Sequence, residues 1–106
     1  MAARETGDRR EMARLYFYMG RMYADLGDLK KAIELFEQAL LAAREVGDRK
    51  GESVTLNYMG QAYADLGDLK KAIELFEQAL LAAREAGDRK GESAILDNMG
   101  LGICRS

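Results

Sequence analysis

The residues of this sequence that are best suited to chemistry are pairs of carboxylates. Glu34 with Glu37 and Glu74 with Glu77 are pairs of the kind that general acid and base catalysis uses. Each pair lies among lysines, on the side of its stretch opposite to the apolar residues, so we interpret both pairs as solvated surface. The sequence contains no histidine, which removes the commonest general base and the commonest metal ligand.

The other candidates for chemistry are isolated. Cys104 is the only cysteine and has no histidine partner, so we interpret it as a buried or incidental residue rather than a nucleophile. Gly100-Leu101-Gly102 lacks the strand and helix context of a phosphate loop. The surroundings of Asp25 and Asp65 do not resemble a calcium loop. We therefore expect a protein that is not an enzyme, with no cofactor and no metal.

Length and charge narrow the class of protein further. A chain of 106 residues is long enough for one domain with a core, and no stretch is apolar for long enough to span a bilayer. The net charge of −2 gives no broad positive field, so we expect neither nucleic acid nor a membrane as a partner. A single cysteine cannot form an internal disulfide, which favours a reducing, cytoplasmic location.

The elements that must position any site come from a repeat. The stretch from Ala24 to Ser53 returns as Ala64 to Ser93 with one change, from Val46 to Ala86. Gly can close a helix in the left-handed conformation, and Asp can then cap the next helix. We therefore predict a joint between helices at each Gly-Asp dipeptide, which recurs at a constant interval: Gly7-Asp8, Gly27-Asp28, Gly47-Asp48, Gly67-Asp68 and Gly87-Asp88. Two helices with their joints then make one unit, whose length is typical of a solenoid repeat.

This spacing predicts an all-α superhelix of about five helices in antiparallel hairpins. The expected helices are 9–26, 29–46, 49–66, 69–86 and one from near Arg89 to Ser106. We expect a single domain, 1–106, with units 9–48 and 49–88 and partial units 1–8 and 89–106. The first helix carries apolar residues at helical spacing, namely Leu15, Tyr16, Met19, Met22, Tyr23 and Leu26. The second carries Ala32, Ile33, Phe36, Ala39, Leu40 and Ala43.

Seven residues lie at matching places in the two units. The second unit has Leu56, Met59, Gly60, Tyr63, Ala72, Phe76 and Ala79, and the first unit has Tyr16, Met19, Gly20, Tyr23, Ala32, Phe36 and Ala39. This pattern resembles that of the tetratricopeptide repeat. The last, partial unit keeps Leu96, Met99 and Gly100 but has Ile103 in place of the tyrosine. The sequence departs from the pattern at Arg44 and Arg84, where the family has proline, and in its longer unit.

The glycines inside the first helices predict close packing. Glycine in a helix costs about 1 kcal/mol relative to alanine. We therefore expect a neighbouring helix to approach closely at Gly20, Gly60 and Gly100, facing alanines such as Ala32 and Ala72. Tyr23, Phe36, Tyr63 and Phe76 would fill the gaps between hairpins.

The first helices differ from one another, whereas the second helices, 29–45 and 69–85, are identical. The resemblance implies that first helices line a concave groove that holds a peptide. The groove candidates are Arg14, Phe17, Tyr18, Arg21, Asp25, Asn57, Tyr58, Gln61, Asp65, Asp97 and Leu101. Drift on a solvent-exposed face is the alternative interpretation of these differences.

Two hypotheses for the function follow. The first is a protein interaction module that binds a peptide or helix of a partner protein in the groove. The second is a self-assembling or structural fragment, excised from a longer array or constructed, because repeat arrays with bare apolar ends form homo-oligomers. Such oligomers would form through uncapped ends or through exchange of a hairpin.

Overall fold

The computed structural model describes residues 2–104, with side chains described for residues 8–100. The described residues form helices and no strand, which confirms the predicted all-α class. The helices are α1 (Ala2–Asp25), α2 (Leu29–Glu45), α3 (Arg49–Asp65), α4 (Leu69–Ala86) and α5 (Arg89–Cys104).

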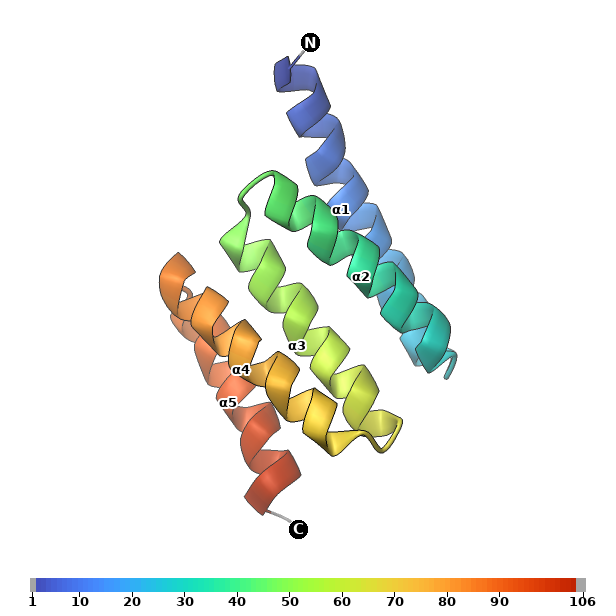
Figure 1. The fold of residues 1–106 in the computed structure, drawn as a ribbon, viewed down its shortest axis with the longest axis vertical. Coiled ribbons are helices and arrows are strands. Elements are labelled where there is room, and N and C mark those ends of the chain that lie inside the picture. Colours follow the sequence, from blue (N-terminus) through green and yellow to red (C-terminus); the bar gives the residue numbers. More distant parts are fainter. Residues whose placement is uncertain (1, 105–106) are drawn as a thin grey trace.

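Successive helices lie antiparallel and side by side, so that α1 with α2 and α3 with α4 form hairpins (Figure 1). The α5 helix packs on α4 at the C-terminal end of the array. The molecule measures 51 × 31 × 18 Å, and the first turn of α1 and the last turn of α5 lie at opposite ends of its longest dimension (Figure 1). Contacts therefore run mainly between neighbouring helices, as in a solenoid.

The predicted Gly-Asp joints are present at four places. Gly27, Gly47, Gly67 and Gly87 have φ angles of 89°, 70°, 89° and 69°, the left-handed conformation that glycine adopts without strain. The aspartate after each glycine caps the next helix; Asp48 Oδ1, for example, accepts a hydrogen bond of 2.9 Å from the N–H of Gly51. The joints are thus encoded locally, by two adjacent residues.

The predicted joint at Gly7-Asp8 is wrong, because α1 continues through it from Ala2 to Asp25. A turn at Gly7 would need a helix before it that could pack back on α1, and no described helix precedes α1. Ala, Arg and Glu, which favour the helix, make up most of the residues before Gly7, and α1 continues through it.

The core depends on a close approach between each first helix and its hairpin partner. A Cβ atom at Gly20 would lie 2.7 Å from Cε1 of Phe36, and one at Gly60 would lie 2.6 Å from Cε1 of Phe76. Both phenylalanines are buried, together with the alanines of α2 and all those of α4 except Ala86. The prediction for Gly100 is wrong: a Cβ atom there would meet nothing within 4 Å, because no described helix follows α5.

One face of α1 is apolar and exposed. We call Leu15, Met19, Met22 and Leu26 the α1 stripe; their exposed fractions are 61, 43, 64 and 79%. The matching positions of α3, one repeat unit later, are Thr55, Met59 and Ala62, which are buried, and Leu66, which is 45% exposed. The first helix is thus less covered than its apolar spacing predicts, whereas the predicted apolar face of α2 is buried.

Charged side chains join successive helices along one edge of the array. The inter-helix ion pairs of the described residues are Arg9–Glu45, Arg44–Glu52, Arg49–Glu85 and Arg84–Glu92. The Glu52 carboxylate is buried and lies 3.2 Å from Arg44 Nε and 2.9 Å from Arg49 Nη1. Hydrogen bonds to Glu85 and to Glu52 raise the pKa of the Arg49 guanidinium above its ordinary value. Glu52 therefore connects α2 to α3, and Arg49 connects α3 to α4.

Replacing Gly60 and Gly100 by alanine should have opposite effects on stability. Gly60→Ala should destabilise the fold by about 1–3 kcal/mol because the new methyl group overlaps the Phe76 ring. Gly100→Ala should stabilise it by up to about 1 kcal/mol, because the site is open and alanine favours the helix. Urea unfolding followed by circular dichroism measures both changes, and equal effects would contradict the close approach.

Replacing Glu52 and Glu92 by glutamine should show that the buried carboxylate contributes more to stability than the partly exposed one. Glu52→Gln should lower the free energy of unfolding by about 1–3 kcal/mol, because it removes the charge that two arginines share. Glu92→Gln should cost less than about 1 kcal/mol, because its side chain is 29% exposed and pairs with Arg84 alone. The same unfolding measurement compares them, and a larger loss at Glu92 would refute this assignment.

Candidate functional site

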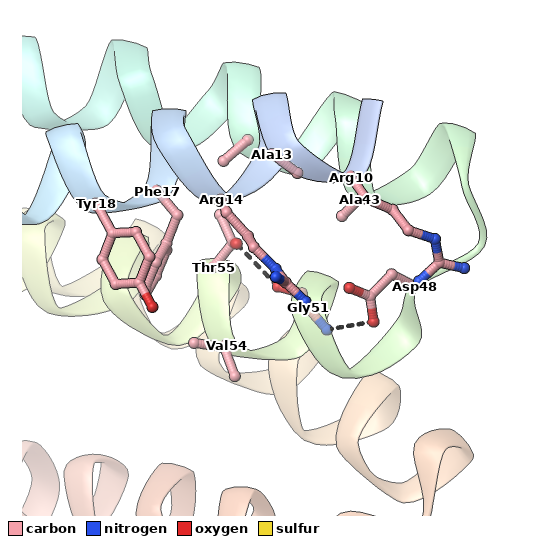
Figure 2. Close-up of a pocket in the computed structure, with 11 residues that line it drawn as sticks. Arg10, Ala13, Arg14, Phe17, Tyr18, Ala43, Asp48, Gly51, Val54 and Thr55 are labelled. Atoms are coloured by element: carbon pink, nitrogen blue, oxygen red, sulfur yellow. Dashed lines mark hydrogen bonds between the residues drawn. The ribbon is translucent and has the colours of Figure 1, made fainter. Parts of the chain in front are cut away.

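A hollow of about 100 Å³ lies between α1, α2 and the first turns of α3. We call it the first hollow; it is lined by Arg10, Ala13, Arg14, Phe17, Tyr18, Ala39, Ala43, Asp48, Gly51, Val54 and Thr55. Figure 2 shows Arg10 and Arg14 reaching from α1 toward the start of α3, with Phe17 and Tyr18 farther along α1. The first hollow thus combines two guanidinium groups with two aromatic rings.

A second hollow, of about 150 Å³, lies farther along the same helices. Its lining residues are Arg21, Ala24, Asp25, Leu29, Phe36, Tyr58, Gln61, Ala62 and Asp65. Asp25 and Asp65 are exposed and come from α1 and α3, so the second hollow has carboxylates from both helices. We refer to this and the first hollow together as the paired hollows.

Aromatic rings link the paired hollows. The ring of Phe17 lies edge-on to Tyr58 at a centroid distance of 5.1 Å and 5.9 Å from Phe36. The Arg21 guanidinium carbon lies 5.2 Å from the centroid of the Tyr58 ring, a cation–π contact. Phe17 is consequently half-buried, at the wall of the first hollow.

The structure brings together eight of the eleven predicted groove residues. Arg14, Phe17 and Tyr18 line the first hollow. Five more line the second, namely Arg21, Asp25, Tyr58, Gln61 and Asp65.

The other three lie elsewhere. Asn57 accepts a hydrogen bond of 2.9 Å from Asn98 Nδ2 and so joins α3 to α5. Asp97 is exposed on α5. The side chain of Leu101 lies outside the described residues.

Sequence reasoning missed several lining residues. Arg10 precedes Arg14 by one helical turn, and this spacing was a signal that could have found it. Leu29, Phe36, Ala39 and Ala43 come from α2, which is identical in sequence to α4 over 17 residues. A comparison of the units shows no variation there, and so it gives no indication of a site.

A third hollow, of about 300 Å³, lies among α2, α3 and α4. Its lining residues are Glu37, Leu40, Leu41, Arg44, Leu56, Met59, Tyr63, Lys71, Leu75 and Gln78. None of the predicted groove residues lines it. Its apolar lining includes core residues such as Leu56 and Met59, so it is mainly the surface over the junction of two hairpins.

Among the described residues, the candidates for chemistry have no surroundings that would activate them. Glu34, Glu37, Glu74 and Glu77 are exposed, and residues 100–102 belong to helix α5 rather than to a loop. No group of three or more potential metal ligands occurs in the described part of the chain. Between residues 2 and 104, no helix has both the length and the apolar character needed to cross a bilayer.

The fold and the paired hollows define an α-helical repeat array of antiparallel hairpins. A family model described as tetratricopeptide repeat matches residues 11–85 and, in an overlapping match, residues 51–101. The chain belongs to the tetratricopeptide repeat family, which confirms the resemblance seen in its sequence. Members of this family generally mediate protein–protein interactions and are typically not enzymes. A search of curated proteins gave no match.

Phe17 and Tyr18 should differ in their effect on stability. Phe17→Ala should destabilise the fold by about 1–3 kcal/mol, because its ring packs against Phe36 and Tyr58. Tyr18→Ala should cost less than about 1 kcal/mol, because Tyr18 is mostly exposed. Thermal unfolding of both variants tests this, and a stable Phe17→Ala variant would show that the aromatic contacts contribute little.

Proposed function

We propose that this chain is a non-enzymatic protein interaction module that binds a peptide segment of a partner protein across the paired hollows. The observation that carries the proposal is the convergence of eight predicted groove residues on two neighbouring hollows. The proposal takes residues 1–106 as one repeat domain with units 9–48 and 49–88, acting in the cytoplasm on protein rather than on nucleic acid or membrane.

Charge and shape favour a particular kind of peptide. Arg10 and Arg14 suit an acidic side chain in the first hollow, because guanidinium groups bind carboxylates through paired hydrogen bonds. Asp25 and Asp65 suit a basic side chain in the second hollow. Tyr18 offers an exposed ring to an apolar residue between them. The expected ligand therefore carries an acidic and a basic residue on either side of an apolar one.

A charge reversal in the first hollow should weaken peptide binding. Peptides selected from a random display library against the wild-type chain should bind Arg14→Glu at least about tenfold more weakly, as measured by fluorescence anisotropy, because a favourable charge becomes repulsive. The matched control is Lys70→Glu, which makes the same charge change at an exposed residue outside the paired hollows. Equal affinity for wild type and Arg14→Glu would refute binding in the first hollow.

Self-assembly is the second candidate function, and the exposed α1 stripe favours it. Terminal faces of repeat arrays are polar where the array stays monomeric. Among the described helices none covers the apolar α1 stripe, and Leu96 of α5 is also exposed. Both candidates are compatible with the family, because the paired hollows and the α1 stripe involve different residues.

A further inference from the structure

We propose that one pair of side chains at each junction between hairpins determines which units can stack next to each other. The first junction lies between the α1–α2 hairpin and α3, and the second lies between the α3–α4 hairpin and α5. Phe17 and Tyr58, the aromatic pair, belong to the first junction, and Asn57 and Asn98, the amide pair, belong to the second. This inference concerns the order of the units and does not depend on peptide binding in the paired hollows.

Many of the contacts at the two junctions are the same. The α2 and α4 helices are identical in sequence over 17 residues, and α3 and α5 begin with the same sequence, RKGES. The ion pairs repeat as well, because Arg44 Nε lies 3.2 Å from Glu52 and Arg84 Nε lies 3.0 Å from Glu92. These shared contacts would hold the α1–α2 hairpin on α5 as well as on α3. Misassembly between similar units is a characteristic error of repeat proteins.

The contacts between neighbouring first helices differ between the junctions. At the first junction the Phe17 ring lies edge-on to the Tyr58 ring, with the centroids 5.1 Å apart. At the second junction Asn98 Nδ2 donates a hydrogen bond of 2.9 Å to Asn57 Oδ1. Both pairs join residues that are 41 positions apart in the sequence, so they occupy equivalent places in the array. The same place thus carries two rings at one junction and two amides at the other.

An exchange of neighbours would break both pairs. With the α1–α2 hairpin on α5, the Phe17 ring would face the amide of Asn98. The side chains of both pairs are partly buried, so this amide would lose its hydrogen bond without regaining full contact with water. Arg21 adds to the cost, because its guanidinium carbon lies 5.2 Å from the centroid of the Tyr58 ring, and α5 has Asn98 at that place. Wrong neighbours are thus rejected by unmatched groups.

The order of the units also decides where the candidate site forms. Phe17 lines the first hollow and Tyr58 lines the second, so the paired hollows meet at the aromatic pair. At the second junction the equivalent place holds two amides that bond to each other. The neighbour that α1 accepts therefore determines at which junction the paired hollows lie.

Transplanting the aromatic pair into the second junction tests the matching of the pairs. Asn57→Phe and Asn98→Tyr should each raise the unfolding equilibrium constant of the full chain about fivefold or more, because each places a ring against an amide. The double variant should return this constant to within about twofold of the wild-type value, because the second junction then holds an aromatic pair. Urea unfolding followed by circular dichroism measures all three variants. Additive effects of the two substitutions would overturn the proposal.

Refolding at high concentration tests the role in ordering the units. In the Asn57→Phe/Asn98→Tyr double variant both junctions carry an aromatic pair, so the α1–α2 hairpin of one chain fits α5 of another. After dilution from urea, sedimentation velocity should detect at least about threefold more associated chain than for wild type. Val54→Ala is the matched control, because it introduces the residue of the equivalent position, Ala94, outside the two pairs, and it should refold like wild type. Equal association of the double variant and wild type, or of the double variant and the control, would refute the role in ordering.

Discussion

The close approach of a phenylalanine to a glycine on the facing helix is the contact on which this array depends. Phe36 and Phe76 occupy the space that a side chain at Gly20 or Gly60 would need. The distance between the helices of each hairpin follows from this contact. Because the Phe36 ring also lies 5.9 Å from the ring of Phe17, the same residue that sets the hairpin packing supports one wall of the candidate site. The core and the candidate site therefore share Phe36, so a substitution of this residue affects both.

Most of the fold could be predicted because the same local sequence signals occur in both repeat units. A glycine that closes a helix and an aspartate that begins the next recur at fixed spacing, and the joints they make are local. The two wrong predictions concern sites where the local signal is present but the helix that would pack against it is not among the described residues. Gly7-Asp8 has the dipeptide without a described helix before it, and Gly100 has the glycine without a facing phenylalanine. Sequence pattern gives propensity, but packing partners decide whether a turn or a close approach forms.

The candidate site was predictable from differences between the units and from the family resemblance, which added Asp25 and Asp65. Arg14, Arg21 and Gln61 were identified because they vary along the first helices, and the structure places all three in the paired hollows. Residues of α2 could not be found in this way, because α2 and α4 are identical in sequence over 17 residues. The half-buried state of Phe17 depends on Tyr58, which belongs to the next repeat unit. Helical spacing carries no information about such a contact.

The two edges of the array differ in the side chains that join neighbouring helices. All four inter-helix ion pairs of the described residues lie at the edge where second helices end and first helices begin. Each joins one helix to the next, from α1 through to α5. The opposite edge, at the Gly27 and Gly67 joints, has exposed leucines instead. The second hollow borders this edge through Leu29. Because salt screens charge pairs at a surface, higher ionic strength weakens the contacts along the first edge and leaves the leucine edge, with the second hollow beside it, unaffected.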